Sequence, residues 1–183
     1  VVAFSSWTIL PYILNERSGG FSVNGGYEPL EEANDSTAVV INRVQAYMTD
    51  KGNTRYDMLT WLSAQEYIKK HHPKVVYLGF GETDECAHHG RYDLYLQKAA
   101  DVDRMIGALW YYVQTDPFYK DNTTFIITTD HGRGKNPAAW QTHGFWARGS
   151  GEIWLALIGP DIYPAGEIKE EQKIWQQQIA STI

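Results

Sequence analysis

Two potential metal ligands stand side by side at Asp130 and His131. They follow β-branched and aromatic residues, since residues 124–132 read Thr-Phe-Ile-Ile-Thr-Thr-Asp-His-Gly. A carboxylate oxygen and a ring nitrogen both bind zinc or manganese, and Gly132 would let the backbone turn sharply beside them. Taken alone, the pair equally fits an ordinary strand-end turn that the Asp side chain caps. The segment therefore leaves a metal site and a turn as alternatives.

A second candidate pair is Asp84 and His88. The two residues are four apart in residues 81–89, which read Gly-Glu-Thr-Asp-Glu-Cys-Ala-His-His. If this stretch is helical, residues i and i+4 share a face, so both side chains can reach one ion, whereas His89 would point elsewhere. Cys86, the single cysteine, excludes an internal disulfide, and we interpret it as a small packing residue.

A further histidine lies in a long segment without clear periodicity. His143 precedes Gly144 within residues 133–151, a polar stretch that contains several glycines. Ordered loops of this length in a compact domain are usually functional. We therefore count His143 among the candidate site residues.

Three hydroxyl side chains follow the first apolar run of the chain. Ser5, Ser6 and Thr8 stand where a strand at residues 1–4 would turn into a helix. A hydroxyl in that position can be activated as a nucleophile by helix amides or by a metal. Capping of the helix is the alternative role for a Ser at such a turn.

The elements that must position these residues alternate along the chain. Short apolar runs bounded by polar turns predict buried strands, and apolar residues at helical spacing predict helices. The strands are expected at 1–4, 74–80, 124–129 and 152–158, and the helices at 7–15, 34–49, 57–71, 91–115 and 170–183. Residues 18–29 hold four glycines and are expected to form a surface loop.

This alternation indicates an α/β fold with a mostly parallel sheet and flanking helices. We expect all four strands to lie in one sheet. The candidate ligands then follow strands and fall at one edge of the sheet, where ligands collect in α/β proteins. These residues are Asp84, His88, Asp130, His131 and His143.

Composition narrows the class of protein. A length of 183 residues with 43% hydrophobic residues suits a single domain, residues 1–183, with a real core. No apolar run approaches the roughly 18 residues of a membrane span. A net charge of -6 argues against a nucleic-acid binder, which needs a basic surface. The charge does not exclude small anionic substrates, because a bound dication reverses the local sign.

The two ends of the sequence suggest a longer parent. The chain begins with Val1 and not with Met, so we expect a processed or trimmed piece. The last helical segment stops without a glycine cap or a basic last turn, which suggests truncation there as well. A removed signal segment would fit a periplasmic or secreted protein, and the compartment stays open.

Taken together, the motifs resemble the carboxyl-terminal half of the alkaline phosphatase superfamily, specifically its type I phosphodiesterase, phosphoglycerate mutase and sulfatase-like branches. The order of the motifs carries the resemblance: Gly81-Glu82-Thr83-Asp84 with His88, then Thr129-Asp130-His131-Gly132, then His143-Gly144. The long helix between the first two motifs and the Ile-Gly-Pro ending of the last strand also fit. The resemblance covers residues 73–183.

The resemblance implies two divalent ions, zinc or manganese, on either side of a Ser or Thr nucleophile. By motif, Asp84, His88 and His143 would hold the first ion, and Asp130 and His131 would be half of the second ion's ligands. The family's remaining ligands and its nucleophile come from a segment that we expect upstream of Val1, because residues 1–79 contain no apolar strand that ends in Asp before such a Ser or Thr.

The implied activity of the parent is phosphoryl or sulfuryl transfer from a small phosphate or sulfate ester. The parent would be a phosphoric-ester hydrolase or a phosphomutase, and we expect the present chain alone to be inactive. The alternative is a non-catalytic metal-binding or interaction module of the same fold. The sequence leaves the substrate, the native metal and the oligomeric state open.

Overall fold

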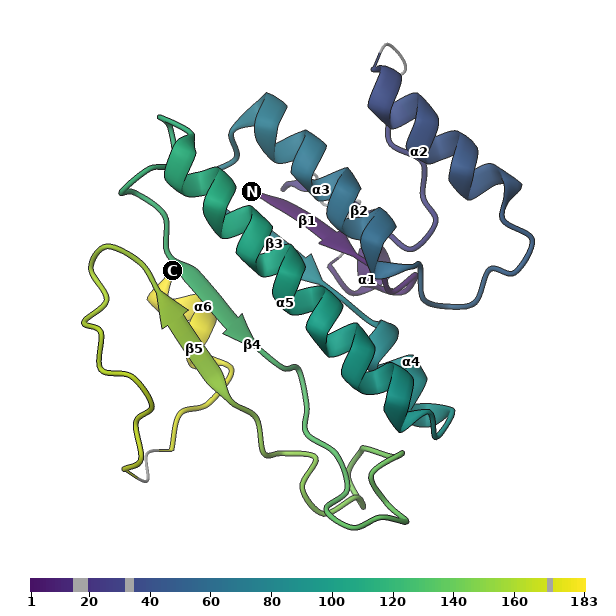
Figure 1. The fold of residues 1–183 in the computed structure, drawn as a ribbon, viewed down its shortest axis with the longest axis vertical. Helices are drawn as coiled ribbons and strands as arrows, with labels where there is room; N and C mark the ends of the chain where they lie inside the picture. Colours follow the sequence, from purple (N-terminus) through teal and green to yellow (C-terminus); the bar gives the residue numbers. More distant parts are fainter. Residues whose placement is uncertain (15–19, 32–34, 171–172) are drawn as a thin grey trace. The chain divides into compact units, whose positions relative to one another are not determined.

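The protein forms two compact units in a computed structural model, Val1–Tyr112 and Val113–Ile183. The structure describes residues 1–14, 20–31, 35–170 and 173–183 (Figure 1). The predicted α/β class is confirmed by a parallel sheet with flanking helices. The organisation of residues 1–183 as a single domain stays a prediction.

The first unit is built on a three-stranded parallel sheet. Its order is β2-β1-β3, with β1 at Val2–Ser5, β2 at Ser22–Gly25 and β3 at Val76–Gly79. Val2 pairs with Ser22 on one side and Val76 on the other. The central strand β1 is buried along its whole length, which accounts for its run of apolar residues.

The strand β2 corrects part of the surface loop predicted at residues 18–29. Residues 22–25 pair with β1 as an edge strand, residues 26–29 form a turn and a loop, and residues 18 and 19 lie outside the described residues. Gly25 is needed there for close approach, since a Cβ on it would lie 2.5 Å from Pro11 Cδ. Asn24 is buried at 9% exposure, and its Nδ2 donates to the Glu28 carbonyl at 3.1 Å. Tertiary contacts therefore outweigh the turn signals of the sequence.

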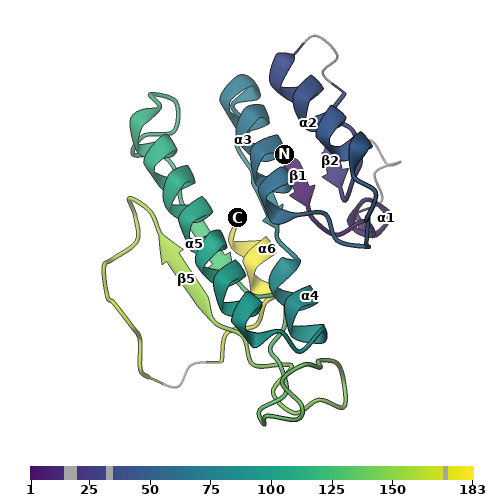
Figure 2. The same cartoon turned by 45° about the vertical axis from the view of Figure 1, so that its right-hand side comes forward.

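Helices flank this sheet, and α2 and α3 lie side by side (Figure 2). Their bounds are Leu10–Ile13 for α1, Ser36–Tyr47 for α2 and Asp57–His71 for α3. The α3 bounds match the prediction, whereas α1 and α2 are shorter than the predicted 7–15 and 34–49. Residues 15 and 34 lie outside the described residues. The Asp35 side chain caps α2 by accepting from the Thr37 amide at 2.7 Å.

Two further helices follow β3. The short helix α4 spans Glu82–His88, which confirms the helical arrangement expected for residues 84 and 88. The helix α5 spans Tyr92–Thr115 and continues into the second unit. In the first unit, Trp61 Nε1 donates to the Met105 carbonyl at 3.2 Å and ties α3 to α5. Within the described part of the chain, no helix combines the length and the apolar character needed to cross a membrane.

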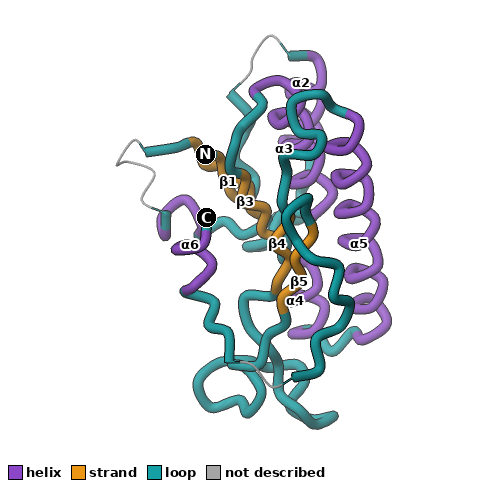
Figure 3. Tube along the Cα trace, turned by 90° about the vertical axis from the view of Figure 1, so that its left-hand side faces the viewer, coloured by secondary structure: helices purple, strands orange, loops and turns teal. Residues whose placement is uncertain are grey.

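The second unit contains an antiparallel strand pair, and Figure 3 draws its two strands in orange. The strand β4 spans Phe125–Thr128 and pairs with β5, Leu155–Ile158, so that Thr128 lies opposite Leu155. Residues 129–154, which join the strands, are all described and contain no helix or strand. The last helix, α6 at Gln178–Thr182, is shorter than the predicted 170–183, of which residues 171 and 172 lie outside the described residues.

The prediction of one shared sheet is wrong. The strands β3 and β4 belong to different sheets, a parallel one of three strands and an antiparallel one of two. In addition, β4 is half-buried, although its apolar run predicts a buried strand. An apolar run indicates that a strand forms, but the pairing partner depends on residues far away in the sequence.

Candidate metal centre

Asp84 and His88, the first pair of predicted ligands, lie close together on α4. Asp84 Oδ2 lies 3.1 Å from His88 Nε2, and the two side chains are 36% and 41% exposed. Two atoms bound to one zinc ion at about 2.0 to 2.2 Å are roughly 3.3 to 3.6 Å apart in tetrahedral geometry. The observed separation of 3.1 Å is slightly shorter, so both atoms can reach one divalent ion after a small movement of the side chains.

The N-terminus of α4 is held by a buried carboxylate from α3. The Gly81 amide donates to Asp57 Oδ1 at 2.8 Å, and the Glu82 amide donates to Asp57 Oδ2 at 3.1 Å. In return, the Asp57 amide donates to Glu82 Oε2 at 2.8 Å. The other oxygen of Glu82 lies 2.7 Å from Lys98 Nζ in an ion pair. The start of α4, which carries two predicted ligands, is thus fixed by several contacts with charged side chains.

A buried polar network stands behind this carboxylate. Arg55 is 0% exposed, and its Nε donates to Thr60 Oγ1 at 2.9 Å. Its Nη1 donates to Asn24 Oδ1 at 2.9 Å and to Gln45 Oε1 at 3.2 Å. Burial lowers the pKa of Arg55 to about 10, so the guanidinium remains charged at neutral pH. Burial also raises the pKa of Asp57, against the opposing effect of its hydrogen bonds from Ser6 and Gly81.

The hydroxyls of Ser5 and Ser6 belong to this interior. Ser6 is 0% exposed, its Oγ donates to Asp57 Oδ1 at 2.6 Å, and it lies 2.7 Å from Thr60 Oγ1. Ser5 is 3% exposed, and its Oγ accepts from the Trp7 amide at 3.0 Å in a capping arrangement. Of the two roles expected for these hydroxyls, the structure supports the structural one, because a nucleophile must be reachable by a substrate.

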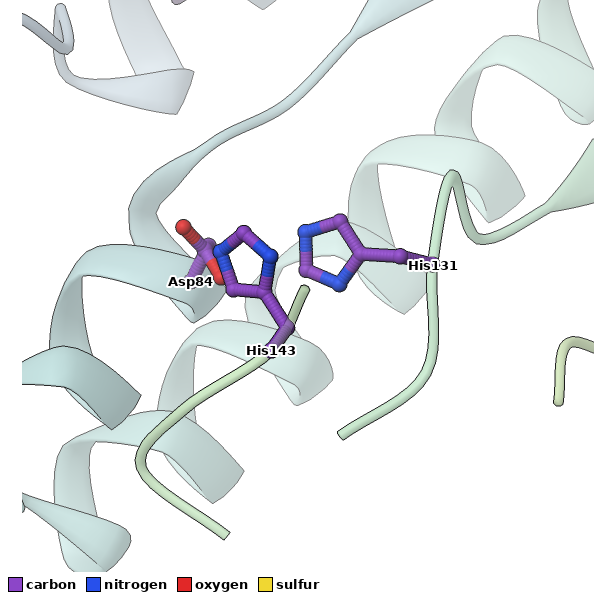
Figure 4. Close-up of side chains that lie close together, drawn as sticks. All are labelled: Asp84, His131 and His143. Carbon is purple, nitrogen blue, oxygen red and sulfur yellow. The ribbon is translucent and has the colours of Figure 1, made fainter. Parts of the chain in front are cut away.

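In the second unit, the rings of His131 and His143 stack on each other (Figure 4). Their centroids are 3.7 Å apart and their planes differ by 15°. His131 Nδ1 lies 2.9 Å from the Gly132 carbonyl, which can only accept, so this nitrogen carries the proton. The tautomer leaves the lone pair on Nε2, as a metal-ligating histidine requires. Figure 4 also labels Asp84, which belongs to the first unit.

Asp130 lies at the exposed end of β4. Its side chain is 83% exposed, and Oδ2 is 3.6 Å from His131 Nε2. Oδ1 accepts from the His131 amide at 3.0 Å, which is the strand-end turn proposed as the alternative role. The turn and the metal site are therefore compatible, since Oδ2 still faces the imidazole. The grouping of His143 with Asp84 and His88 concerns both units and stays a prediction.

The segment that carries His143 is closed by its own hydrogen bonds. The Gly132 amide donates to the Ser150 carbonyl at 2.8 Å, and the Gly134 amide donates to the Thr142 carbonyl at 3.1 Å. Gly132 sits in a tight crossing, because a Cβ there would lie 2.3 Å from the Gly149 carbonyl oxygen. The sequence suggests a sharp turn at Gly132, whereas the structure shows that close backbone approach requires the glycine.

An open cavity of about 830 Å³ lies in this segment beside His143. Phe145 and Trp146 line it and are 93% and 92% exposed. Lys135 and Arg148 add positive charge to its wall. Sequence reasoning did not single out these residues, because neither their spacing nor their types follow a known ligand pattern.

Comparison with known proteins supports a metal-dependent class. A family model described as the Metalloenzyme superfamily matches residues 20–144. Comparisons with curated proteins and with solved structures found no match. The range matched by the family model spans more than half of the chain. It contains all five predicted ligands, Asp84, His88, Asp130, His131 and His143.

Proposed function

Since the chain belongs to the Metalloenzyme superfamily, part of the alkaline phosphatase-like group, we propose that it is the ligand-bearing part of a two-metal enzyme. The reaction is phosphoryl or sulfuryl transfer from a small phosphate or sulfate ester. The observation that carries the proposal is the Asp84–His88 pair, whose ligand atoms are 3.1 Å apart on a firmly held helix. Divalent metal use follows from the family, and the identity of the metal, zinc or manganese, is part of the proposal.

The proposed ligands fall into two sets. Asp84, His88 and His143 hold the first ion, while Asp130 and His131 hold the second. The stack of His131 on His143 supports this division, because two-metal sites place their ions about 4 Å apart and so need ligands of both ions at close range. The His131 tautomer, with its proton on Nδ1, supports ligation through Nε2.

In this proposal, the residues of this chain hold the metal ions and orient their ligands. When bound, the ions would supply the charge that activates a nucleophile and stabilises the leaving oxygen. The α4 helix holds Asp84 and His88 on one face, and the Gly132 carbonyl keeps His131 in the ligating tautomer. Ser5 and Ser6 are not assigned as nucleophiles, because both are buried and hydrogen-bonded. Thr8 is half-buried and is not assigned a role.

Calorimetric titration with Mn²⁺ and Zn²⁺ tests the proposal. We expect the unmodified chain to bind and Asp84→Ala to bind at least about tenfold more weakly, because it removes the carboxylate of the first site. Asp103→Ala serves as the matched control, since it removes an exposed carboxylate of α5 outside the site. Equal binding by the unmodified chain and Asp84→Ala would contradict the proposed ligand set.

A further inference from the structure

We propose that Asp57 is a positioning residue of the metal centre, which fixes the N-terminus of α4 and thereby the direction of Asp84 and His88. This inference rests on the proposed function. The inference is based on the contact between Asp57, the first residue of α3, and Glu82, the first residue of α4. The two residues are 25 positions apart in the sequence.

Each of these two carboxylates accepts hydrogen bonds at the start of the other's helix. Asp57 binds the Gly81 and Glu82 amides at 2.8 and 3.1 Å, and Glu82 binds the Asp57 amide at 2.8 Å. The first amides of a helix lack intrahelical partners and carry partial positive charge. A carboxylate accepts hydrogen bonds from these amides and its negative charge offsets their partial positive charge. The reciprocal arrangement therefore holds the two helix N-termini together.

The Asp57 side chain cannot move independently of the core. The residue is 2% exposed, and Ser6 Oγ donates to the same Oδ1 that accepts from Gly81. Thr60 and Arg55 continue the network on the far side of Ser6. Hydrogen bonds in such a buried network are stronger than in water and restrict side-chain rotation. The position of the carboxylate is therefore set by α3 together with Ser6, which directly follows β1.

The path from Asp57 to the ligands is short. Its bonds end on the amides of residues 81 and 82, and Asp84 follows within the first turn of α4. Ala87, in the same helix, is fully buried at 0% exposure and packs α4 against the core. Metal ligands must be held within about 0.5 Å of the binding geometry by surrounding contacts. A change at residue 57 should therefore alter metal binding as well as stability.

The test compares Asp57→Asn with Ser63→Ala. The Asn side chain keeps the size of Asp57 but places an NH₂ group against an amide donor, which disrupts the contact with α4. Ser63 is a second buried polar residue of α3, at 1% exposure, whose Oγ donates to the Leu59 carbonyl at 2.8 Å. Affinity is measured with Co²⁺, whose visible absorption also reports the geometry of its ligands, well below the unfolding temperature of each variant.

We expect Asp57→Asn to bind Co²⁺ about tenfold more weakly with an altered spectrum, which is the range for residues that orient metal ligands. Ser63→Ala should lose stability and keep both affinity and spectrum. If Asp57→Asn does not fold, Glu82→Gln tests the same contact from the other side and should also weaken binding.

Two outcomes separate the two proposals. If the folded test variant, Asp57→Asn or its substitute Glu82→Gln, binds Co²⁺ as the unmodified chain does while Asp84→Ala does not, the positioning role is overturned and the proposed function stands. If the unmodified chain binds no Co²⁺, or Asp84→Ala binds as tightly as the unmodified chain, the proposed function fails and the positioning role fails with it.

Discussion

The carboxylates of Asp57 and Glu82 cap each other's helices. Asp57 accepts from the Glu82 amide at 3.1 Å, and Glu82 accepts from the Asp57 amide at 2.8 Å. Capping boxes of this kind usually lie within one helix, between residues three positions apart. Here the same chemistry joins two helices, so that the helix with the predicted metal ligands begins at a point set by the protein core.

Removal of the Ser6 hydroxyl should destabilise the first unit. Ser6→Ala removes one hydrogen bond at Asp57 Oδ1 and one at Thr60 Oγ1, each of which contributes about 0.5 to 1.5 kcal/mol to the unfolding free energy. Urea denaturation followed by circular dichroism measures the loss. Ser36→Ala, at an exposed position in the first turn of α2, should change the stability by less than about 0.5 kcal/mol. A Ser6→Ala variant as stable as the unmodified chain would show that the network does not depend on this hydroxyl.

Two glycine substitutions should act in opposite directions. Gly26→Ala is expected to destabilise, because Gly26 has φ +54° and a Cβ would lie 2.3 Å from Thr8 Cγ2. The left-handed backbone alone costs about 1 to 2 kcal/mol for a residue with a Cβ. Gly107→Ala lies within α5, where nothing is within 4 Å of the added Cβ, and should stabilise by about 0.5 to 1 kcal/mol. Thermal unfolding of both variants tests this prediction. Changes in Tm that have the same sign in the two variants would contradict it.

Gly132→Ala should disrupt the segment that carries both stacked histidines. The added Cβ would lie 2.3 Å from the Gly149 oxygen and 2.4 Å from the Glu152 oxygen, so the backbone must separate. We expect faster amide hydrogen exchange in β4 and β5 and loss of the ring contact between His131 and His143 in NMR spectra. Gly151→Ala is the matched control, because no atom lies within 4 Å of its Cβ. Similar exchange in the two variants would show that the crossing at Gly132 is not required.

The present chain should bind one divalent ion well and a second poorly, with almost no turnover. Two residues, Asp130 and His131, are a weak ligand set, and the correct positioning of reactants accounts for about 7 to 11 kcal/mol of barrier lowering. Metal at a hundredfold excess over its Kd should add about 2.7 kcal/mol of stability, a rise in Tm of roughly 5 to 11 °C.

Calorimetry, thermal unfolding and hydrolysis of nitrophenyl phosphate and bis(nitrophenyl) phosphate test this prediction. Asp84→Ala should abolish the tighter binding event, whereas Asp130→Ala should affect the weaker one. Efficient hydrolysis that either substitution abolishes would contradict the prediction, because a nucleophile would then have to lie within residues 1–183.

Local sequence patterns predicted the structure correctly where it depends on residues that are close in the sequence. The helix α3 has the predicted bounds, because apolar spacing and Pro73 act over a few residues. The Asp84–His88 pair shares a face of α4 as expected, since the geometry of a helix places residues four apart together. The types of the candidate ligands likewise followed from the sequence, and the family match covers them.

Contacts between distant residues were decided only by the tertiary structure. The glycines in and around β2 predict a loop, although the segment pairs with β1, and the apolar run at β4 does not reveal that β5 is its partner. The Asp57–Glu82 contact and the His131–His143 stack join residues 25 and 12 positions apart. Periodicity records which side of an element is apolar, whereas the choice of partner depends on how the whole chain packs, so these relationships emerged only once the chain was folded.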